Sequence, residues 1–299
     1  MASRALVDPH HHLWDVTHHP YPWLHRKPAD AGPEGDITPI AGDYLLDDYV
    51  ADTRDFQVVK SVHVQCGWLR SDPVGETEWL QSIADSRGFP HGIVAYAELG
   101  DRNVEAVLAG HRQFDNLRGI RQILNWHRDP VKTYLQNPCL LRDESWLCGF
   151  RLLKKYDLSF DLQLYPSQLT DAVELAAQHP DQSIILNHAG MPVDRDESAL
   201  SAWRRGIRLL SRQENVSVKI SALGMFDRLW TTASIRPFIL ETIEAFGTER
   251  SMFASNFPVD KLYGTFSALY TAYNDVTSDF SEAERSMMFC SNAERLYRI

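Results

Sequence analysis

Three consecutive histidines, His10, His11 and His12, lie at the end of a short apolar run near the N-terminus. If this run is a strand, His10 and His12 point to one face and His11 points to the other, because side chains alternate along a strand. Two imidazoles about 6–7 Å apart on one face can hold a metal ion or form the polar base of an active site. The apolar residues 5–7 and 13–14 on either side distinguish this cluster from a solvated histidine tag.

The rest of the chain supplies elements that could position such a cluster. Eight short, largely apolar runs predict strands buried on both faces, at 5–12, 58–67, 92–99, 117–124, 159–165, 183–190, 216–223 and 252–258. Amphipathic segments predict helices between them, at 77–87, 103–114, 143–156, 169–179, 197–212 and 235–246, with one or two closing helices in 267–299. This alternation predicts a single (β/α)8 barrel domain over 1–299, in which the Pro-, Gly- and His-rich stretch 15–48 forms a long first loop over the mouth. An open doubly wound sheet is the alternative, but no Gly-x-Gly-x-x-Gly follows the first strand.

Composition narrows the range of functions and partners. A net charge of −10 makes nucleic acid an unsuitable partner, because phosphate binding needs a basic face. The four cysteines form no Cys-x-x-Cys pair, which is typical of reduced thiols in a cytoplasmic protein. No signal segment and no run of about 18 apolar residues occurs, so we expect a soluble protein without a membrane partner. The sequence leaves homo-oligomerisation open.

Polar residues recur at the carboxyl ends of the predicted strands, where barrel enzymes carry their active sites. These are His10 and His12, His63, Gln65 and Cys66, Glu98, Arg118, Arg121 and Gln122, Asp161 and Gln163, Asn187 and His188, Lys219 and Ser221, and Ser255 and Asn256, with His127 and Asp260 shortly after two of the strands. Each has a structural alternative. Arg118 or Arg121 could form a core ion pair, Lys219 could extend its charge to solvent, His63 could be a hydrogen-bonded histidine on the helix side, and His127 a surface loop residue. Together, however, the set predicts a pocket for a small-molecule substrate.

Several motifs, in order along the whole chain, resemble the amidohydrolase superfamily in its lactonase-like "amidohydrolase 2" branch. The opening Asp8-Pro-His-His-His-Leu-Trp-Asp15 resembles the family's D-x-H-x-H-x-W-D. The other matching blocks are Val64-Gln65 with Glu76-Thr-Glu-Trp-Leu80, Leu117-Arg-Gly-Ile-Arg-Gln122, Ile184-Ile-Leu-Asn-His-Ala-Gly190, Val218-Lys-Ile-Ser221, Met252-Phe-Ala-Ser-Asn-Phe-Pro-Val259 and Asn292-Ala-Glu-Arg-Leu-Tyr297. The resemblance implies a (β/α)8 hydrolase that opens small lactones, either sugar-acid lactones or lactones from aromatic degradation.

The same resemblance implies site residues and a metal. His10, His12 and His188 match histidines that would hold one divalent metal, zinc or manganese. Asn256 stands where the family usually has a catalytic aspartate, and Gln163 where a fully metallated member usually has histidine. Asn256 cannot take up a proton at neutral pH. The branch that the chain resembles also includes members that work without metal, so metal-dependent and metal-free chemistry stand as equal alternatives.

We therefore expect His10, His12, His188, Asn256 and Asp260 to be catalytic. The missing base is a histidine or Asp260, with Asp161 as a further candidate. We expect the substrate to be bound by Arg118, Arg121, Gln163, Lys219, His127 and Trp14, and Tyr21, Trp23 and Trp126 could add an aromatic wall or simply pack their loops. Two alternatives to lactone hydrolysis remain: metal-dependent, non-oxidative decarboxylation of an aromatic acid, and non-catalytic binding of a small molecule.

Overall fold

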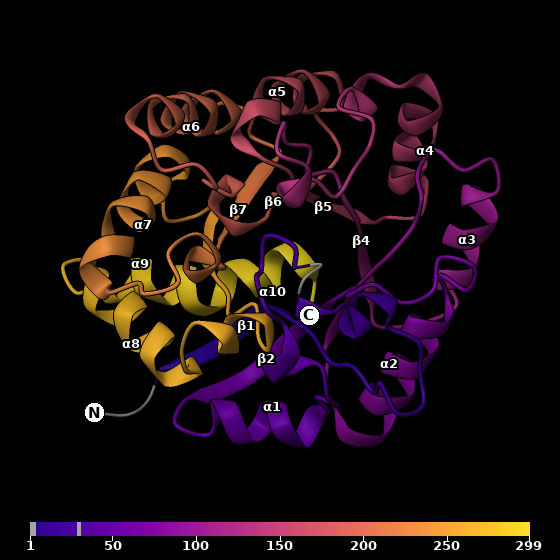
Figure 1. The fold of residues 1–299 in the computed structure, drawn as a ribbon, viewed down its shortest axis with the longest axis horizontal. Coiled ribbons are helices and arrows are strands. Elements are labelled where there is room, and N and C mark those ends of the chain that lie inside the picture. The colour runs from indigo at the N-terminus through magenta and orange to yellow at the C-terminus, as the bar shows by residue number, and fades with distance from the viewer. Residues whose placement is uncertain (1–3, 29–30) are drawn as a thin grey trace.

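The computed structural model describes residues 4–28 and 31–299 as a closed parallel barrel (Figure 1). Its eight strands follow one another around the sheet in chain order, and every neighbouring pair from β1–β2 to β7–β8 is parallel. The barrel closes where the His12 amide donates to the Phe257 carbonyl at 2.7 Å and the Asn256 amide donates to the His10 carbonyl at 2.8 Å. The strands are β1 (Ala5–His11), β2 (Gln57–Val64), β3 (Gly92–Ala95), β4 (Leu117–Ile123), β5 (Ser159–Gln163), β6 (Ile184–Leu186), β7 (Val216–Ile220) and β8 (Ser251–Phe253). The predicted (β/α)8 barrel is confirmed.

Helices surround the barrel as predicted, with differences at two places. They are α1 (Leu46–Thr53), α2 (Gly75–Arg87), α3 (Val104–His111), α4 (Glu144–Lys155), α5 (Leu169–Gln178), α6 (Glu197–Leu210), α7 (Thr232–Phe246), α8 (Phe266–Val276), α9 (Glu282–Ser286) and α10 (Asn292–Tyr297). The helix α1, which has eight residues and buries Leu46, Tyr49 and Thr53, was not predicted from the sequence. The closing segment contains three helices rather than one or two, with a π-helical turn at Met287–Ser291 between α9 and α10. No helix in the described residues is long and apolar enough to cross a membrane.

All eight strands end earlier than the sequence predicts, and the difference is largest at β8, followed by β3 and β6. After β6, His188 and Ala189 adopt positive φ angles of 58° and 52°, and after β8 Asn256 has a φ of 57°. Such left-handed backbone is disfavoured for residues with a Cβ and costs about 1–3 kcal/mol, which is typical of functional positions. The polar ends of these predicted strands are therefore tight turns at the barrel mouth.

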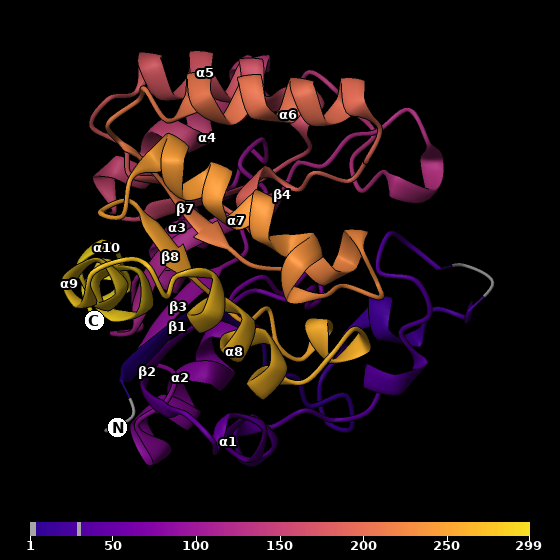
Figure 2. The same ribbon diagram turned by 90° about the vertical axis from the view of Figure 1, so that its left-hand side faces the viewer.

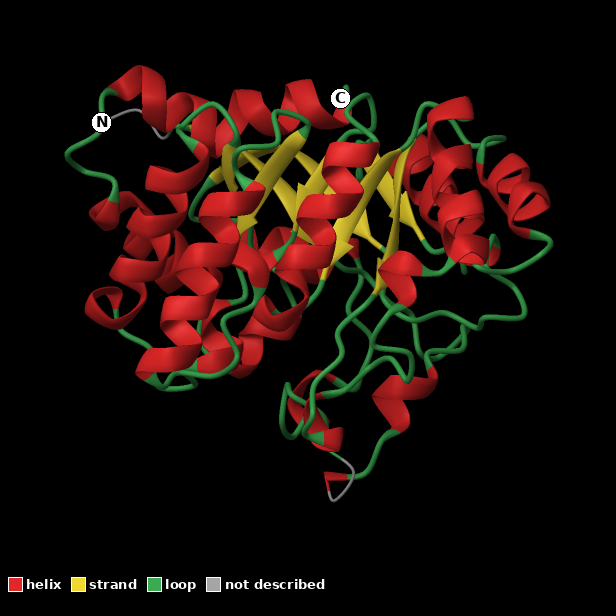
Figure 3. Ribbon diagram, turned by 90° about the horizontal axis from the view of Figure 1, so that it is seen from above, coloured by secondary structure: helices red, strands yellow, loops and turns green. Residues whose placement is uncertain are grey.

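The long first loop lies across the mouth, as predicted. Figure 3 shows the longest loops on the side toward which the strand arrows point. In this first loop, Glu34 accepts a hydrogen bond from the Tyr134 hydroxyl, which follows β4, and its carbonyl accepts one from the Tyr263 hydroxyl, which follows β8, at 2.7 Å. A single residue of the loop thus bridges two segments from opposite parts of the barrel.

The C-terminal helix closes the other end of the barrel. Figure 2 shows α9 and α10 at the end from which the strands start. Ala293 and Tyr297 of α10 are buried in one apolar cluster with Val7, Val62 and Met252 of the barrel strands. Residues near the end of the chain therefore form part of the barrel interior.

We expect Gly149→Ala to lower the free energy of unfolding by about 1–3 kcal/mol, because it overpacks the contact between α4 and the segment after β3. A Cβ at Gly149 would clash with the Leu99 carbonyl, which is backbone and cannot rotate away. Gly42→Ala is the matched control, since a Cβ there meets nothing within 4 Å. Urea denaturation of both variants checks this, and equal midpoints would contradict the packing described.

Candidate functional site

The predicted histidines meet at the carboxyl ends of the strands. The ring centroids of His10 and His12 are 5.1 Å apart, and those of His10 and His188 are 4.7 Å apart. His11 points to the other face, where it stacks on Tyr49 at 4.3 Å and contacts the Ser61 hydroxyl at 3.0 Å. The alternation predicted from the sequence therefore brings His10, His12 and His188 together and keeps His11 out of the group.

His10 lies between two cationic side chains. The Lys219 Nζ is 3.4 Å from its Nδ1, and the Arg121 Nη1 is 3.5 Å from its Nε2. Burial, together with the nearby charges of Lys219 and Arg121, lowers the pKa of His10 well below its ordinary value. His10 is therefore a neutral imidazole at neutral pH.

Arg121 is fixed inside the barrel by two acceptors. Its Nη1 donates to the Gln163 Oε1 at 2.8 Å, and its Nη2 donates to the Gln65 carbonyl. Burial lowers the pKa of Arg121 to about 10, so the guanidinium remains a cation at neutral pH. The structure thus places Arg121 and Gln163 beside His10, where they can face a substrate.

Arg118 does not join this group. Its guanidinium donates to the carbonyls of Asp115, Leu117 and Arg298, near the start of β4. Arg118 and Arg121 are three residues apart on one strand, so they point to opposite faces. Our expectation that Arg118 binds substrate is therefore corrected: its contacts tie the start of β4 to the C-terminus.

Lys219 and Asp161 form a fully buried ion pair across the barrel. Their Nζ and Oδ1 atoms are 2.5 Å apart, and both side chains have zero exposure. Burial lowers the pKa of Lys219 to about 8. Lys219 therefore neither reaches solvent nor presents its charge to a substrate, which corrects its predicted binding role. Asp161 has partners that occupy its carboxylate, so it is not a free base.

Asn256 connects His12 to a buried carboxyl group. Its Nδ2 donates to the Asp260 Oδ1 at 2.8 Å, and its Oδ1 lies 3.3 Å from the His12 Nε2. Burial raises the pKa of Asp260 to about 7, against the smaller opposing effects of its hydrogen bonds from Asn256 and the Ala222 backbone. Asp260 thus provides, four residues later, an ionisable carboxyl group next to the asparagine.

His188 and His127 have different surroundings. The Nδ1 of His188 lies 2.8 Å from the Ser221 hydroxyl, which fixes the ring. The Nε2 of His127 lies 2.9 Å from the Asp194 Oδ2, and His127 lines a hollow of about 280 Å³ with Trp126 and Tyr165. His127 is therefore neither a free surface residue nor in contact with the three central histidines.

Trp14 belongs to the packing of the first loop. It is fully buried, its Nε1 donates to the Gly42 carbonyl at 2.8 Å, and it contacts the Trp23 ring edge-on at 5.6 Å. Tyr21 is buried in the same cluster. Trp14 also lies parallel to His12, with ring centroids 6.4 Å apart, so it supports that histidine from outside.

The structure brings together a compact group of side chains that could bind a metal ion, and this group differs from the predicted one. Among residues 4–28 and 31–299, three donor side chains have ligand atoms within 4.8 Å of one another, and they are His12, His63 and Cys66. Cys66 also contacts the Glu76 carboxylate at 3.1 Å, and burial raises the pKa of Glu76 to about 7. The sequence places His63 and Cys66 near the end of one predicted strand but does not predict that they share a site with His12, because their approach to His12 depends on neighbouring strands.

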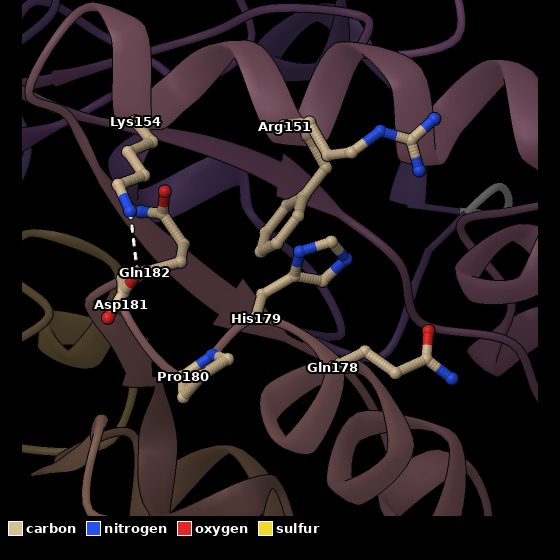
Figure 4. Close-up of a pocket in the computed structure, with 8 residues that line it drawn as sticks. Arg151, Lys154, Gln178, His179, Pro180, Asp181 and Gln182 are labelled. Atoms are coloured by element: carbon tan, nitrogen blue, oxygen red, sulfur yellow. Dashed lines mark hydrogen bonds and ion pairs between the residues drawn. The ribbon is translucent and has the colours of Figure 1, made fainter.

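A second hollow lies outside the barrel and carries none of the predicted residues. It has a volume of about 210 Å³ and lies between α4 and the segment after α5 (Figure 4). Lys154 and Asp181 form an ion pair at its edge at 2.6 Å, with side chains more than half exposed. It is separate from the histidine group.

Known proteins of similar sequence and structure match along the whole chain. An uncharacterised protein, y4mH of Sinorhizobium fredii, is 46% identical over the full length of both chains. An L-fucono-1,5-lactonase of Burkholderia multivorans is 27% identical over 98% of this chain and 96% of its own. A crystal structure of a Burkholderia multivorans amidohydrolase with bound HEPES has a TM-score of 0.83 at 26% identity, covering 99% of each chain, and a second crystal form of it contains zinc.

The family assignment rests on a match that includes every strand of the barrel. The amidohydrolase family model matches residues 7–299, from the first strand with its histidines to the last residue. Together with the barrel and the histidines at its mouth, this match shows that the chain belongs to the amidohydrolase family.

Proposed function

We propose that this protein hydrolyses a small lactone by attack of water on the ester carbonyl. One observation carries the proposal. At the mouth of the barrel the buried guanidinium of Arg121 lies beside the neutral His10, and Asp260 supplies a carboxyl group whose pKa is about 7. A relative named L-fucono-1,5-lactonase supports a sugar-acid lactone as the class of substrate.

The residues divide the reaction into three tasks. Arg121 binds the carbonyl oxygen, where negative charge develops as water adds. Asp260 takes a proton from water as the water oxygen bonds to the carbonyl carbon, and Asn256 holds this carboxylate in place. The ring carbon–oxygen bond then breaks and the ring oxygen receives the proton, so the products are a hydroxyl group and a carboxylic acid.

The predicted metal set of His10, His12 and His188 does not fit a divalent cation. Both ring nitrogens of His10 face cations, Lys219 and Arg121, which would repel a metal there. His12, His63 and Cys66 fit better, since two imidazoles and a thiol suit zinc. The His12 Nδ1 donates to the Val64 carbonyl at 2.7 Å, so its Nε2, which lies 3.3 Å from the Asn256 Oδ1, would be the ligand atom. Zinc held there would supply a Lewis acid for an ester oxygen.

We expect Cys66→Ser to weaken zinc binding at least about 10-fold, since thiolate is the preferred ligand for zinc in this set. Zinc titration followed by elemental analysis measures it, and His188→Gln is the matched control because His188 lies outside the set. If His188→Gln loses zinc and Cys66→Ser keeps it, the originally predicted ligands are correct and this set is wrong.

A substrate panel separates lactone hydrolysis from its alternatives. We expect purified protein to release acid from sugar-acid 1,5-lactones, measured with a pH indicator, and to release no carbon dioxide from hydroxybenzoates. Carbon dioxide release without lactone opening would support the decarboxylase instead. Saturable binding without turnover of any panel member would support a non-catalytic binding protein.

A further inference from the structure

A column of buried polar side chains connects the C-terminal helix to His10. The Tyr297 hydroxyl of α10 lies 2.9 and 3.0 Å from the two oxygens of Asp161, which pairs with Lys219 at 2.5 Å. Lys219 in turn lies 3.4 Å from the Nδ1 of His10, and all four side chains have zero exposure. The mechanism above uses neither Lys219, Asp161 nor Tyr297, although unpaired buried charges are costly to a fold.

The contact with Lys219 determines which ring nitrogen of His10 carries the proton. A lysine ammonium has three donors and no acceptor, so the nitrogen that faces it must carry a lone pair. Both ring nitrogens of His10 face cationic donors, an arrangement that opposes an imidazolium. In a neutral imidazole one nitrogen is the acceptor and the other is an N–H donor. Lys219 at Nδ1 therefore places the single proton of His10 on Nε2.

This arrangement leaves two donors facing each other. The Nε2–H of His10 and the Nη1 of Arg121 are 3.5 Å apart, and a guanidinium also has no acceptor. The Nη1 already donates to Gln163 at 2.8 Å, and the Arg121 Nε is buried without a hydrogen-bond partner in the described residues. Two donors at this spacing can be satisfied together by one oxygen that lies about 2.9 Å from each.

We propose that Tyr297, Asp161 and Lys219 are positioning residues that fix His10 as the Nε2–H tautomer, so that His10 and Arg121 together bind the carbonyl oxygen of the substrate. The proposal rests on the proposed hydrolysis of a lactone and assigns the second donor of its oxyanion site. It also links the last turn of the chain to that site, because Tyr297 approaches Asp161 from the closed end of the barrel.

The tautomer can be measured without any substrate. In protein with ¹⁵N-labelled histidine, long-range proton–nitrogen correlation spectra distinguish protonated from unprotonated ring nitrogens, and His10→Gln identifies the signals of His10. We expect Nε2 to be protonated and Nδ1 unprotonated in the wild type. We expect Lys219→Met to yield a mixture or the Nδ1–H form, whereas Lys219→Arg, whose guanidinium has donors and no acceptor, keeps the wild-type form. An Nδ1–H tautomer in the wild type, or an unchanged tautomer in Lys219→Met, would overturn the proposal.

Kinetics on L-fucono-1,5-lactone test the role of the column in catalysis. We expect Lys219→Met to lower kcat about 10²-fold, as loss of one oxyanion donor does, with KM changed less than about threefold. Tyr297→Phe removes one hydrogen bond to Asp161 and should lower kcat about fivefold, in keeping with about 1 kcal/mol for such a bond. Tyr44→Phe is the matched control, since its buried hydroxyl also donates to a carboxylate, that of Asp52 at 2.7 Å, away from His10.

Failure of this proposal differs from failure of the proposed function. If the wild type opens the lactone but Tyr297→Phe and Tyr44→Phe behave alike and the tautomer is unaffected by Lys219→Met, the column has only a structural role. Should Lys219→Met not fold, the double variant Lys219→Met/Asp161→Leu removes both buried charges and keeps the tautomer measurement decisive. If the tautomer depends on Lys219 but no lactone is opened, the positioning role is supported and the lactonase proposal is wrong.

Discussion

Arg121→Met is expected to lower kcat/KM for a lactone by about 10²–10³-fold, the effect of removing one donor from an oxyanion site. The guanidinium is a fixed cation beside His10, held by Gln163 and the Gln65 carbonyl, so it needs no reorganisation when charge develops. We expect Arg121→Lys to recover little of the rate, because an ammonium cannot donate to both acceptors with the same geometry and still reach the substrate. Steady-state kinetics of the three proteins measure the effect.

The matched control lies on the same strand. Arg118→Met removes an equal charge from β4 on the other face, where the side chain contacts only backbone carbonyls among the described residues. We expect it to change kcat/KM less than about threefold, while lowering stability slightly through the lost contact with the C-terminus. Equal losses of activity in the two variants would contradict the placement of Arg121 at the site.

Asp260→Asn is expected to lower kcat/KM by about 10²–10⁴-fold, the usual contribution of a general base. The wild-type rate should rise tenfold per pH unit below pH 7 and level off above it, because burial raises the pKa of Asp260 to about 7 and only the carboxylate accepts a proton. Asn256, the Ala222 backbone, Tyr263 and Tyr273 surround this carboxyl group. The variant should show residual activity without this rise.

A second buried carboxyl group supplies the control for the pH profile. Burial also raises the pKa of Glu76 to about 7, but Glu76 lies against Cys66 rather than Asn256. The rise near pH 7 should therefore remain in Glu76→Gln and disappear in Asp260→Asn. The opposite result would assign the base to Glu76.

The same pKa predicts how Asp260 affects stability. Its pKa is higher in the folded protein than in the unfolded chain, so the folded state binds more protons between about pH 4 and pH 7. The contribution of Asp260 to the free energy of unfolding therefore falls as pH rises through this window, by about 1.4 kcal/mol for each unit of pKa difference, and is constant above it. Urea denaturation at several pH values should show a shallower decline in Asp260→Asn; an equal or steeper decline would contradict the burial of this group.

The sequence predicts the barrel well because parallel strands buried on both faces are largely apolar, and most of these eight strands are. It does not predict where β6 and β8 end, since His188 and Asn256 continue a strand-like pattern while their backbone turns into the left-handed region. The short helix α1 was missed because three buried positions in eight residues give a weak periodic signal.

The sequence predicts those features of the site that depend only on the alternation of side chains along a single strand. His10 and His12 share a face by their spacing of two, and the spacing of three between Arg118 and Arg121 could have separated them in the same way. Contacts between distant elements could not be predicted. Lys219 meets Asp161 across the barrel, Tyr297 reaches the same pair from the last helix, and Cys66 approaches His12 only because β1 and β2 are neighbours.

Hydrolysis of L-fucono-1,5-lactone in ¹⁸O-labelled water shows whether the enzyme opens the lactone by attack of water on the carbonyl carbon. We expect turnover well above the spontaneous rate, with one ¹⁸O atom in the carboxylate of the product and none in the new hydroxyl group, because water attacks the carbonyl carbon and the ring oxygen leaves with the sugar. Turnover no faster than the spontaneous rate across sugar-acid lactones, or ¹⁸O in the hydroxyl group, would contradict it.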